Sequence, residues 1–543
     1  MDPVIVVGAG PVGLALALSL AAQKVPSVVL DEQPGGEEPR PVRTAVLRPD
    51  TAAFVERLGC AAVRDEGARW TGWRGMRRAT LQRQVSFGDD PEGPDGPGNL
   101  DGGPSPVHLP QHALTRALRD AAAVSRLVRL APAGRLDALE QDDDGVAAHT
   151  TGPDATWWRG SYLVGCDGAR STVRKLLDVR FAGRTAVERL AVVALRTELP
   201  WPGEAVLHRL PPWRSAGEEI TARPLPEGAW RVDWLLPDRS ELVTPDALMG
   251  RLRDTLAGWC GTTPPYELLD TGVYTLHHRL ARRWRVRRAF LAGDAAHLLG
   301  AVGIQGLDEG LRDVSNLAWK LAQAWHHGAS EVLLDSYQTE RRASVAARLR
   351  AADQAMQVLR GGGGLRAYLP GAARGHDTLL ADGHLGRGPL GAPPSYPHSP
   401  LAPPPAEAHT PVGTEVGAPV DDVPVTAPDG SVVALRDRLG RGRLLVVLVA
   451  PGTGVWDRRH WLTAGVMPRL TAAVNTLPAE AELLVAEAYP GAAAHTVLLV
   501  RPDGHLVAAF GGVWPGELYT AADAVRGGAV VHARAEDRTA DIN

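Results

Sequence analysis

Three short segments of the sequence combine glycines with an aspartate that follows an apolar run. They are GAGPVG at 8–13 with Asp31 after the next apolar run, Asp167-Gly168 in LVGCDGARSTVRKLL, and Gly293-Asp294 in AFLAGDAAH, with Gly303 and Gly306 beyond it. Glycines let a ligand approach the backbone closely, and a helix N-terminus attracts anions. These residue types therefore suit a ligand that carries phosphates and hydroxyl groups.

The first segment has the spacing of a dinucleotide-binding turn. It lies between the predicted strand PVIVV and an apolar helix, which is the setting that this motif requires. Gly8 permits the tight turn, Gly10 gives the pyrophosphate room, and Gly13 lets the helix pack on the strand. Asp31 ends the second strand, where a carboxylate can bind a ribose. The alternative is a glycine-rich loop without a ligand, and the motif alone does not separate NAD from FAD.

The other two segments are ambiguous when each is taken alone. Asp167-Gly168 ends a predicted strand and precedes a helix that Ser171 or Thr172 would cap. Gly293-Asp294 follows the predicted strand 289–292. An aspartate in this position is often only part of a local turn, so the case for a cofactor rests on all three segments together.

Together the three segments resemble the class A FAD-dependent aromatic hydroxylases, the para-hydroxybenzoate hydroxylase type, over roughly residues 3–360. The resemblance implies a cofactor-binding role for each matching position. The ADP half of FAD would be held by Gly8, Gly10, Gly13 and Asp31, and Arg43 would reach the pyrophosphate. Gln111, which opens a helix, would also contact the cofactor. Asp167 and Gly168 would serve both FAD and the pyridine nucleotide, and Asp294 would bind the ribityl chain. The turn from Gly303 to Gly306 would bring the backbone N–H groups of Leu307 and Asp308 to the flavin pyrimidine edge.

The sequence departs from this family at three places before the last predicted helix. Gly300-Ala301 stands where the family usually has Pro-Pro, 303–306 reads GIQG where the family has GGQG, and Asp308 replaces an asparagine. A carboxylate beside the flavin would oppose the charge of its reduced form. We therefore expect Asp308 to serve as the N-cap of that helix, the alternative being a side chain that points away from the flavin.

The resemblance also implies the reaction. NADPH or NADH docks transiently and reduces FAD, O2 adds to give a C4a-hydroperoxide, and one oxygen atom passes to an aromatic substrate. We expect a strand-rich region, 180–265, to form the floor of the substrate cavity, with structural roles for its polar residues His208, Arg223 and Asp233, and we assign no catalytic residue. The alternatives are a Baeyer–Villiger or ring-opening oxygenase on the same scaffold, and a flavin-binding scaffold without turnover.

The elements that must position these residues form an α/β fold with three parts. We expect a Rossmann-like FAD-binding domain at 1–178 and 266–360, an inserted β-sheet substrate domain at 179–265, a linker at 361–406 and a thioredoxin-like C-terminal domain at 407–543. In the FAD-binding domain, Leu307, Leu311, Val314, Leu317, Leu321 and Trp325 share the apolar face of a long helix.

Where a redox motif would follow RLLVVLVA, the C-terminal domain has PGTGVW without cysteine, which excludes disulfide exchange. The family resemblance, the C-terminal domain and an amino-acid composition typical of a GC-rich genome together point to the tailoring of an aromatic, polycyclic polyketide in antibiotic biosynthesis.

Composition excludes several other functions. The 543 residues carry a net charge of -4 and 44% hydrophobic residues, and no apolar run is long enough to span a membrane. Only three of the 58 Lys and Arg side chains are lysines, so the basic run 279–288 reflects composition more than nucleic-acid binding. The three cysteines are far apart, which argues against disulfides and a metal site. We expect a cytoplasmic monomer or homodimer without nucleic-acid or membrane partners.

Overall fold

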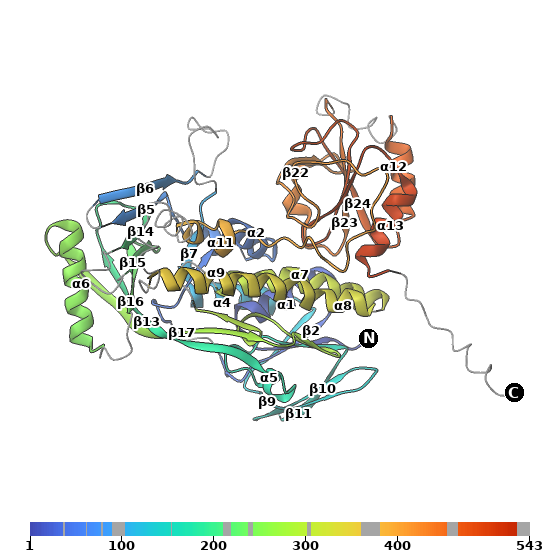
Figure 1. Cartoon of the computed structure of the whole chain (residues 1–543). Helices are drawn as coiled ribbons and strands as arrows, with labels where there is room; N and C mark the ends of the chain where they lie inside the picture. The colour runs from blue at the N-terminus through green and yellow to red at the C-terminus, as the bar shows by residue number, and fades with distance from the viewer. Residues whose placement is uncertain are drawn as a thin grey trace. The chain divides into compact units, whose positions relative to one another are not determined.

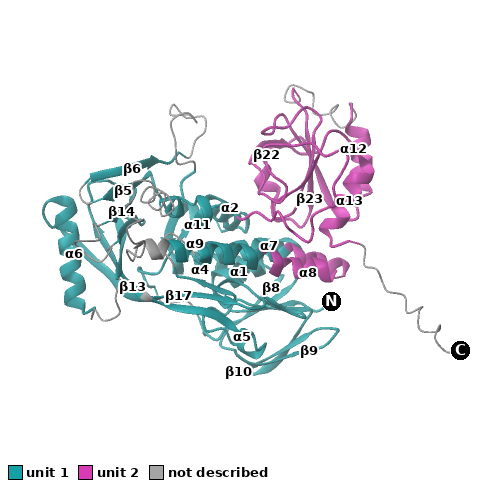
Figure 2. Ribbon diagram, viewed as in Figure 1, with its two compact units in different colours: residues 1–318, 341–393 teal, residues 319–340, 394–543 magenta. Residues whose placement is uncertain are grey.

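The computed structural model (Figure 1) describes most of the chain. The described ranges are 1–35, 39–60, 62–77, 80–88, 104–153, 155–209, 219–236, 243–300, 306–328, 330–359, 381–452 and 465–528, with backbone alone at 62, 187 and 355–359. The chain divides into two compact units, which are coloured separately in Figure 2. Unit 1 comprises residues 1–318 and 341–393, and unit 2 comprises residues 319–340 and 394–543.

A six-stranded sheet forms the centre of the first part of unit 1. Its order is β18(Arg285–Val286)-β19(Ala289–Leu291)-β12(Tyr162–Gly165)-β1(Val4–Val7)-β2(Ser27–Leu30)-β8(Val128–Ala131). Neighbouring strands are parallel, except for the β18 edge. The strands β1, β2 and β12 are buried along their whole length, which explains their unbroken apolar runs. Helices α1(Pro11–Ala22) and α4(Gln111–Val124) contact each other beside this sheet.

An eight-stranded sheet forms the second part of unit 1. Its order is β20(His297–Leu299)-β17(Tyr266–Ala281)-β13(Phe181–Thr197)-β16(Ala229–Leu236)-β15(Glu219–Pro224)-β14(Glu204–Arg209)-β5(Gly72–Arg77)-β6(Thr80–Ser86). Helix α6(Pro245–Cys260) lies along one face (Figure 1), where Leu248, Leu252 and Leu256 pack on alternate residues of β13 and β16. The Thr244 hydroxyl caps this helix by accepting from the Ala247 N–H at 3.1 Å.

Smaller elements complete unit 1. Two three-stranded sheets run in the orders β3(Thr44–Leu47)-β7(Val107–Pro110)-β4(Ala68–Arg69) and β11(Thr156–Gly160)-β10(Val146–Thr151)-β9(Arg135–Gln141). The remaining helices are α2(Pro49–Arg57), α3(Ala62–Asp65), α5(Thr172–Leu176), α9(Ala343–Leu359) and α11(Gly388–Gly391), with a 3-10 turn at Gly293–Ala295. The long helix α7(Gly306–His327) begins in unit 1 and ends in unit 2, and the π-helical turn Gln338–Arg342 does the reverse.

Unit 2 is built on a second six-stranded sheet. Its order is β22(Val432–Ala434)-β21(Pro424–Thr426)-β24(Ala481–Ala486)-β23(Leu444–Val449)-β25(Val497–Val500)-β26(Leu506–Phe510). Alternate residues of β23 point to opposite faces, each with its own apolar core. Helices α12(Met467–Asn475) and α13(Pro515–Val525) cover one face, and α8(Glu331–Tyr337) also belongs to this unit.

A buried group of charges also lies in unit 2. Arg501 donates to both carboxylate oxygens of Glu340, at 2.6 and 3.0 Å, and to Asp503 at 2.6 Å. The Lys320 ammonium contacts Glu340 at 2.7 Å, and His505 contacts Asp503 at 3.1 Å. The side chains of Glu340 and Asp503 are each only 1% exposed, so their charges depend on these partners.

The mixed α/β fold with an inserted β-sheet is as predicted. The eight-stranded sheet extends beyond 179–265, because β5, β6, β17 and β20 pair with it. In the predicted linker, residues 381–406 are described and contain the buried Leu390, Tyr396 and Leu401, whereas 361–380 lie outside the described residues. The division into domains and the thioredoxin-like character of the last one stay predictions.

Candidate FAD-binding site

The three glycines of the first turn have different surroundings. A Cβ atom on Gly13 would lie 1.9 Å from the Gly8 carbonyl oxygen, and one on Gly8 would lie 2.5 Å from the Cys166 carbonyl oxygen. Gly8 also has a φ of +108°, which L side chains rarely adopt. A Cβ atom on Gly10, by contrast, would meet nothing within 4 Å. Gly8 and Gly13 are therefore required by the fold itself, whereas the protein leaves the space beside Gly10 free for a ligand.

Asp31 closes this turn from the neighbouring strand. Its carboxylate accepts the Ala9 N–H at 2.5 Å and the Gln33 N–H at 2.7 Å. The carboxylate is thus fixed beside the glycine turn before any ligand is present. Each carboxylate oxygen has a further lone pair, so Asp31 keeps the capacity to accept from a ribose hydroxyl.

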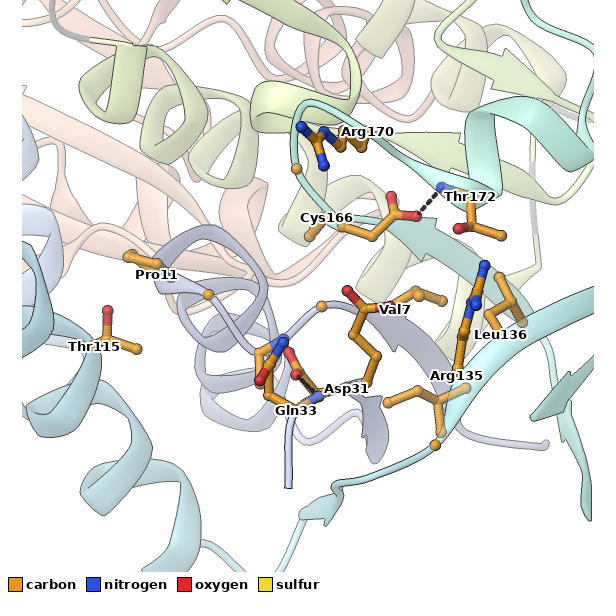
Figure 3. A pocket seen from close by; sticks show the side chains of 18 of the residues that line it. Val7, Pro11, Asp31, Gln33, Thr115, Arg135, Leu136, Cys166, Arg170 and Thr172 are labelled. Atoms are coloured by element: carbon orange, nitrogen blue, oxygen red, sulfur yellow. Dashed lines mark hydrogen bonds between the residues drawn. The ribbon is translucent and has the colours of Figure 1, made fainter. Parts of the chain in front are cut away.

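A cavity of about 780 Å³ opens at the end of β1 and β12. Figure 3 shows Asp31 and Gln33 at one end of this cavity and Cys166, Arg170 and Thr172 at the other. Seven of the predicted residues line it: Gly8, Gly10, Asp31, Arg43, Gln111, Asp167 and Gly168. The cavity therefore brings together residues from five separate parts of the sequence.

Asp167 both caps a helix and faces the cavity. Its Oδ2 accepts the backbone N–H groups of Thr172, at 2.6 Å, and Val173, at 3.0 Å. Ser171 is the N-cap of α5 and accepts the Arg174 N–H at 2.9 Å, so the first of the two predicted caps is confirmed. The other oxygen, Oδ1, is buried without a hydrogen-bond partner in the described part of the chain. Such acceptors are rare and are often satisfied by a ligand.

Arg43 and Gln111 are joined through their backbones. The N–H of Gln111, the first residue of α4, donates to the Arg43 carbonyl at 2.8 Å. Both residues line the cavity, and the Arg43 side chain is exposed to it. Gln111 thus opens a helix as predicted, and the contacts of both residues with the cofactor stay predictions.

Asp294 and the start of α7 lie together beyond this cavity. A Cβ atom on Gly306 would be 3.9 Å from Asp294 Oδ1, so the helix start faces the carboxylate. Asp294 is exposed, but the surrounding protein displaces water from its carboxyl and raises its pKa, while His297 and Arg43 act against the change. Gly303 and Ala301 lie outside the described residues, so the turn that precedes Gly306 stays a prediction.

The predicted N-cap role of Asp308 is wrong. Helix α7 begins at Gly306, so Asp308 is its third residue, and its side chain turns toward the start of α2. Its Oδ1 accepts the Thr51 hydroxyl at 2.5 Å and the Arg48 N–H at 3.3 Å, and its Oδ2 pairs with the Arg48 guanidinium at 3.3 Å. An N-cap must precede the first helical residue, and that position lies outside the described residues.

Burial of Asp308 has a measurable consequence. Burial raises the pKa of Asp308 to about 6, although Arg312 and Arg48 act against it. Since the unfolded pKa is about 3.9, the contribution of Asp308 to stability falls as the pH rises from about 4 to 6 and stays low above that. We expect Asp308→Asn to raise the free energy of unfolding at pH 8 by about 1–3 kcal/mol. Urea unfolding at several pH values measures this, and the gain should vanish near pH 4.

The neighbouring Asp50 provides the matched control. Burial also opposes its ionisation, but Arg312, whose Nε lies 2.9 Å from Asp50 Oδ2, holds the pKa of Asp50 below its usual value. Asp50→Asn should therefore lower stability at pH 8, opposite to Asp308→Asn. A loss of stability in both variants would mean that the ion pair of Asp308 with Arg48 outweighs its burial.

Sequence reasoning missed a buried charge network on the first turns of α7. Glu309 pairs with Arg312 at 2.6 Å, with Arg341 at 2.9 Å and with Arg348 at 2.9 Å. Burial opposes its ionisation, but these three arginines hold the pKa of Glu309 well below its usual value. Asp313 on the next turn pairs with Arg341 at 2.8 Å. The signal was the charge spacing in DEGLRD, which places these side chains three to four residues apart on one helix.

The polar residues of the predicted substrate-cavity floor lie on opposite faces of the eight-stranded sheet. His208 lies on the α6 face, where it accepts the Trp259 indole N–H at 3.0 Å, so it does not face the cofactor domain. Arg223 and Asp233 lie on the opposite face, paired with each other. There Arg231 donates to Asp233 at 2.8 Å and to the Thr44 hydroxyl at 2.8 Å, next to the cavity residue Arg43.

Thr44 continues this chain of hydrogen bonds to a buried histidine. His108 Nδ1 lies 2.7 Å from the Pro224 carbonyl, and its Nε2 lies 2.8 Å from the Thr44 hydroxyl. Because a carbonyl only accepts, Nδ1 carries the proton and Nε2 accepts from Thr44. Burial, and then Arg223, lower the pKa of His108 well below its usual value, consistent with a neutral ring.

The residues of the cavity fit FAD. The bare backbone at Gly10 leaves room for a pyrophosphate, Asp31 suits a ribose, and the buried Asp167 Oδ1 needs a donor. Cationic side chains around the cavity match the phosphate charge: Arg43, Arg119, Arg135, Arg170 and Lys175. A family model described as FAD binding domain matches residues 1–352. The chain belongs to the class A FAD-dependent aromatic hydroxylases.

Named relatives agree with this family. This hydroxylase is 33% identical over 349 residues to the rifampicin monooxygenase of Streptomyces venezuelae, which covers 63% of the chain and 68% of the relative. It is 32% identical over 346 residues to the 3-(3-hydroxy-phenyl)propionate/3-hydroxycinnamic acid hydroxylase of Klebsiella pneumoniae, over 62% of the chain and 59% of the relative. The protein is therefore a flavin-dependent monooxygenase.

Solved structures extend the likeness to nearly the whole chain. The flavin-dependent monooxygenase PieE, solved with FAD and substrate, shares the fold with a TM-score of 0.73 at 21% identity, over 96% of this chain and 98% of that one. The anhydrotetracycline hydroxylase OxyS of Streptomyces rimosus has a TM-score of 0.64 at 25% identity, and the match covers 94% of this chain and 95% of that one. In the described part of the hydroxylase, no helix is long and apolar enough to cross a bilayer. The same residues contain no cluster of His, Cys, Asp and Glu suited to a metal ion.

Proposed function

We propose that this enzyme hydroxylates an aromatic, polycyclic polyketide, with NADPH or NADH as the reductant and O2 as the oxidant. The observation that carries the substrate class is the likeness to the anhydrotetracycline hydroxylase OxyS, which covers 94% of this chain at 25% identity. The 33% identity to rifampicin monooxygenases supports a large substrate as well. The co-substrates are those typical of the family.

We assign each part of FAD to residues that line the cavity or lie near it. Gly10 admits the pyrophosphate, Arg43 neutralises it, and Asp31 binds the ribose of the ADP half. Gln111 and Asp167 contact the middle of the cofactor, with the free Oδ1 of Asp167 as an acceptor. Asp294 would bind the ribityl chain, since it lies beyond the cavity and next to Gly306.

The N-terminus of α7 supplies the positive electrostatic field that would stabilise negative charge on the flavin. The backbone N–H groups of Leu307 and Asp308 belong to the first helical turn, where they have no acceptor within the helix. A helix N-terminus carries about half a positive charge, which would stabilise negative charge that develops on the flavin. When bound, FAD accepts electrons from the pyridine nucleotide and supplies the oxygen-transfer chemistry. The Asp308 carboxylate does not oppose this field at close range, because Arg48 and Thr51 bind it.

We place the aromatic substrate against the face of the eight-stranded sheet that carries Arg231 and Asp233. Their hydrogen-bonded chain reaches Thr44, beside the cofactor-binding Arg43. The side chains of Arg223 and Arg231 stay 12% and 11% exposed while sharing the single carboxylate of Asp233, so this face keeps a positive charge. His208 takes no part, since it lies on the other face.

We further propose that unit 2 contains a thioredoxin-like domain without redox function. Parallel strands β23 and β24 flank α12, and antiparallel β25 and β26 precede α13, which supports that fold. The sequence PGTGVW that follows β23 has no cysteine. A role in disulfide exchange is therefore excluded, and a structural role remains.

The first experiment is the visible spectrum of the purified protein, followed by anaerobic NADPH. We expect oxidised-flavin bands that bleach on addition of NADPH, faster in the presence of one member of a panel of polycyclic phenols and quinones. Oxygen uptake and a product heavier by one oxygen atom would then be measured for that compound. NMR of the product separates ring hydroxylation from insertion next to a carbonyl.

Other outcomes would contradict particular parts of the proposal. A flavoprotein that no compound stimulates and that consumes no oxygen would be a scaffold without turnover. Stimulation by single-ring phenols alone would reject the polycyclic substrate while leaving the monooxygenase in place.

A further inference from the structure

Asp313 is a buried carboxylate that contacts residues on both sides of Asp294, the predicted ribityl-binding residue. It lies at the end of the second turn of α7 and its side chain is 0% exposed. Its two oxygens make one hydrogen-bonding contact with each of three partners, Gly293, His297 and Arg341, none of which binds a cofactor in the assignments above. A fully buried carboxylate without enough donors would be strongly destabilising, so these contacts fix its position.

One oxygen of Asp313 holds both ends of the segment that carries Asp294. Its Oδ2 accepts the Gly293 N–H at 2.9 Å and the His297 Nε2–H at 2.7 Å. The two donors lie immediately before Asp294 and three residues after it. His297 is itself buried and stacks on Trp284, with 5.2 Å between ring centroids, so its side chain cannot change rotamer freely. The backbone around Asp294 is therefore tied at two points to helix α7.

The other oxygen ties the same carboxylate to the first turn of α7. Asp313 Oδ1 accepts the Arg341 Nε–H at 2.8 Å, and Arg341 also donates to the Glu309 carbonyl at 3.1 Å. Close packing reinforces this connection, because a Cβ atom on Gly310 would lie 2.7 Å from the Val12 side chain and 3.3 Å from the Gly293 Cα. The Asp294 segment, the first turn of α7 and the start of α1 thus form one block.

We propose that Asp313 is a positioning residue for flavin binding, which fixes the Asp294 carboxylate relative to the N-terminus of α7. This inference rests on the proposed binding of the ribityl chain by Asp294. In Asp313→Asn only one oxygen remains to accept three donors, and the amide N–H group must face one of them. The segment that carries Asp294 would then lose one of its two ties, and Asp294 would reach the cofactor less well.

A double-mutant cycle on FAD affinity tests the proposal. FAD is removed from the full-length protein, and the Kd for FAD is measured by titration for Asp294→Ala, Asp313→Asn and the double variant. We expect Asp294→Ala to raise the Kd about 30-fold through the loss of charge-assisted hydrogen bonds. Asp313→Asn should raise it about tenfold, as outer partners of a binding group commonly do. The double variant should bind about as weakly as Asp294→Ala, instead of the roughly 300-fold loss that independent effects would give.

Asp503→Asn is the matched control. Asp503 is equally buried and is also paired with one arginine and one histidine, but these are Arg501 and His505 in unit 2. It should lower stability as Asp313→Asn does and leave the Kd for FAD unchanged. An Asp503→Asn variant with the same loss of FAD affinity would show that the effect comes from stability alone and would overturn the proposal.

A second variant keeps the test open if Asp313→Asn fails to fold. His297→Phe keeps a ring against Trp284 and removes the Nε2 donor, without leaving a charge unpaired. We expect it to raise the Kd roughly threefold, and to add nothing when Asp294 is already alanine. Additive effects of His297→Phe and Asp294→Ala would overturn the positioning role. If Asp294→Ala itself leaves the Kd unchanged, the proposed role of Asp294 fails, which is a separate result.

Discussion

Gly13→Ala is expected to lower the free energy of unfolding by about 3 kcal/mol or more, because a Cβ atom there would lie 1.9 Å from the Gly8 carbonyl oxygen. The clash is with the backbone of Gly8, so a side-chain rotation cannot relieve it. To make room, α1 would have to move away from β1, which would distort the cofactor turn. Thermal unfolding of the FAD-free protein measures the loss of stability, and FAD titration should show no tight binding.

Gly10→Ala separates the two roles of glycine within the same turn. A Cβ atom at Gly10 meets nothing within 4 Å of protein, so the FAD-free variant should unfold at the temperature of the parent. Its affinity for FAD should nevertheless fall, because the methyl group would occupy the space proposed for the pyrophosphate. If Gly10→Ala bound FAD as tightly as the parent, the pyrophosphate would have to lie elsewhere.

Arg501→Met is expected to destabilise unit 2 by about 3–5 kcal/mol, because it leaves buried carboxylates without their main partner. Arg501 donates to both Glu340 and Asp503, whose side chains are 1% exposed, and the remaining cationic partner of Glu340 is Lys320. Burial lowers the pKa of Lys320 to about 8, although Glu340 acts against this, so Lys320 replaces the lost charge poorly. The Arg501 guanidinium lies 5.2 Å from the centre of the Trp319 ring, so tryptophan fluorescence during urea unfolding can follow the change.

An exposed arginine of the same unit is the control. Arg443 pairs with Glu480 at 3.0 Å, but the two side chains are 50% and 67% exposed. Arg443→Met should therefore cost no more than about 1 kcal/mol. Equal losses for Arg443→Met and Arg501→Met would mean that burial does not determine the effect of these ion pairs.

The sequence predicted the cofactor turns well because their chemistry is local. Gly8 and Gly10 are recognisable from their spacing alone, and Ser171 is recognisable as a cap from its place before a helix. Neither judgement needs knowledge of distant segments. The separate cofactor contacts of Arg43 and Gln111 were inferred from a family resemblance, and the backbone hydrogen bond between the two residues was visible only in the structure.

The burial of charged residues on α7 could not be predicted in the same way. Leu311 and Val314 were assigned to an apolar face, and both are fully buried. The charged residues Glu309 and Asp313 on the same helix are buried as well, because arginines from distant parts of the chain neutralise them. A sequence pattern treats such side chains as exposed, since their partners are far away in the chain. Asp308 was misassigned for this reason, as its partner Arg48 is the distant residue that immediately precedes α2.

The pairing of β5 with β14 limits how this enzyme can be recombined with its relatives. Gly72 pairs with Glu204 in a parallel register, so two segments separated by more than a hundred residues share one ladder of hydrogen bonds. Exchanging only 179–265 to change specificity would cut this ladder and leave β5 and β6 beside a foreign neighbour. A chimaera that also transfers 72–86 keeps the sheet edge intact. Because β17 and β20 also pair with this sheet, its eight strands come from two separate stretches of sequence, 72–86 and 181–299, which must be exchanged together.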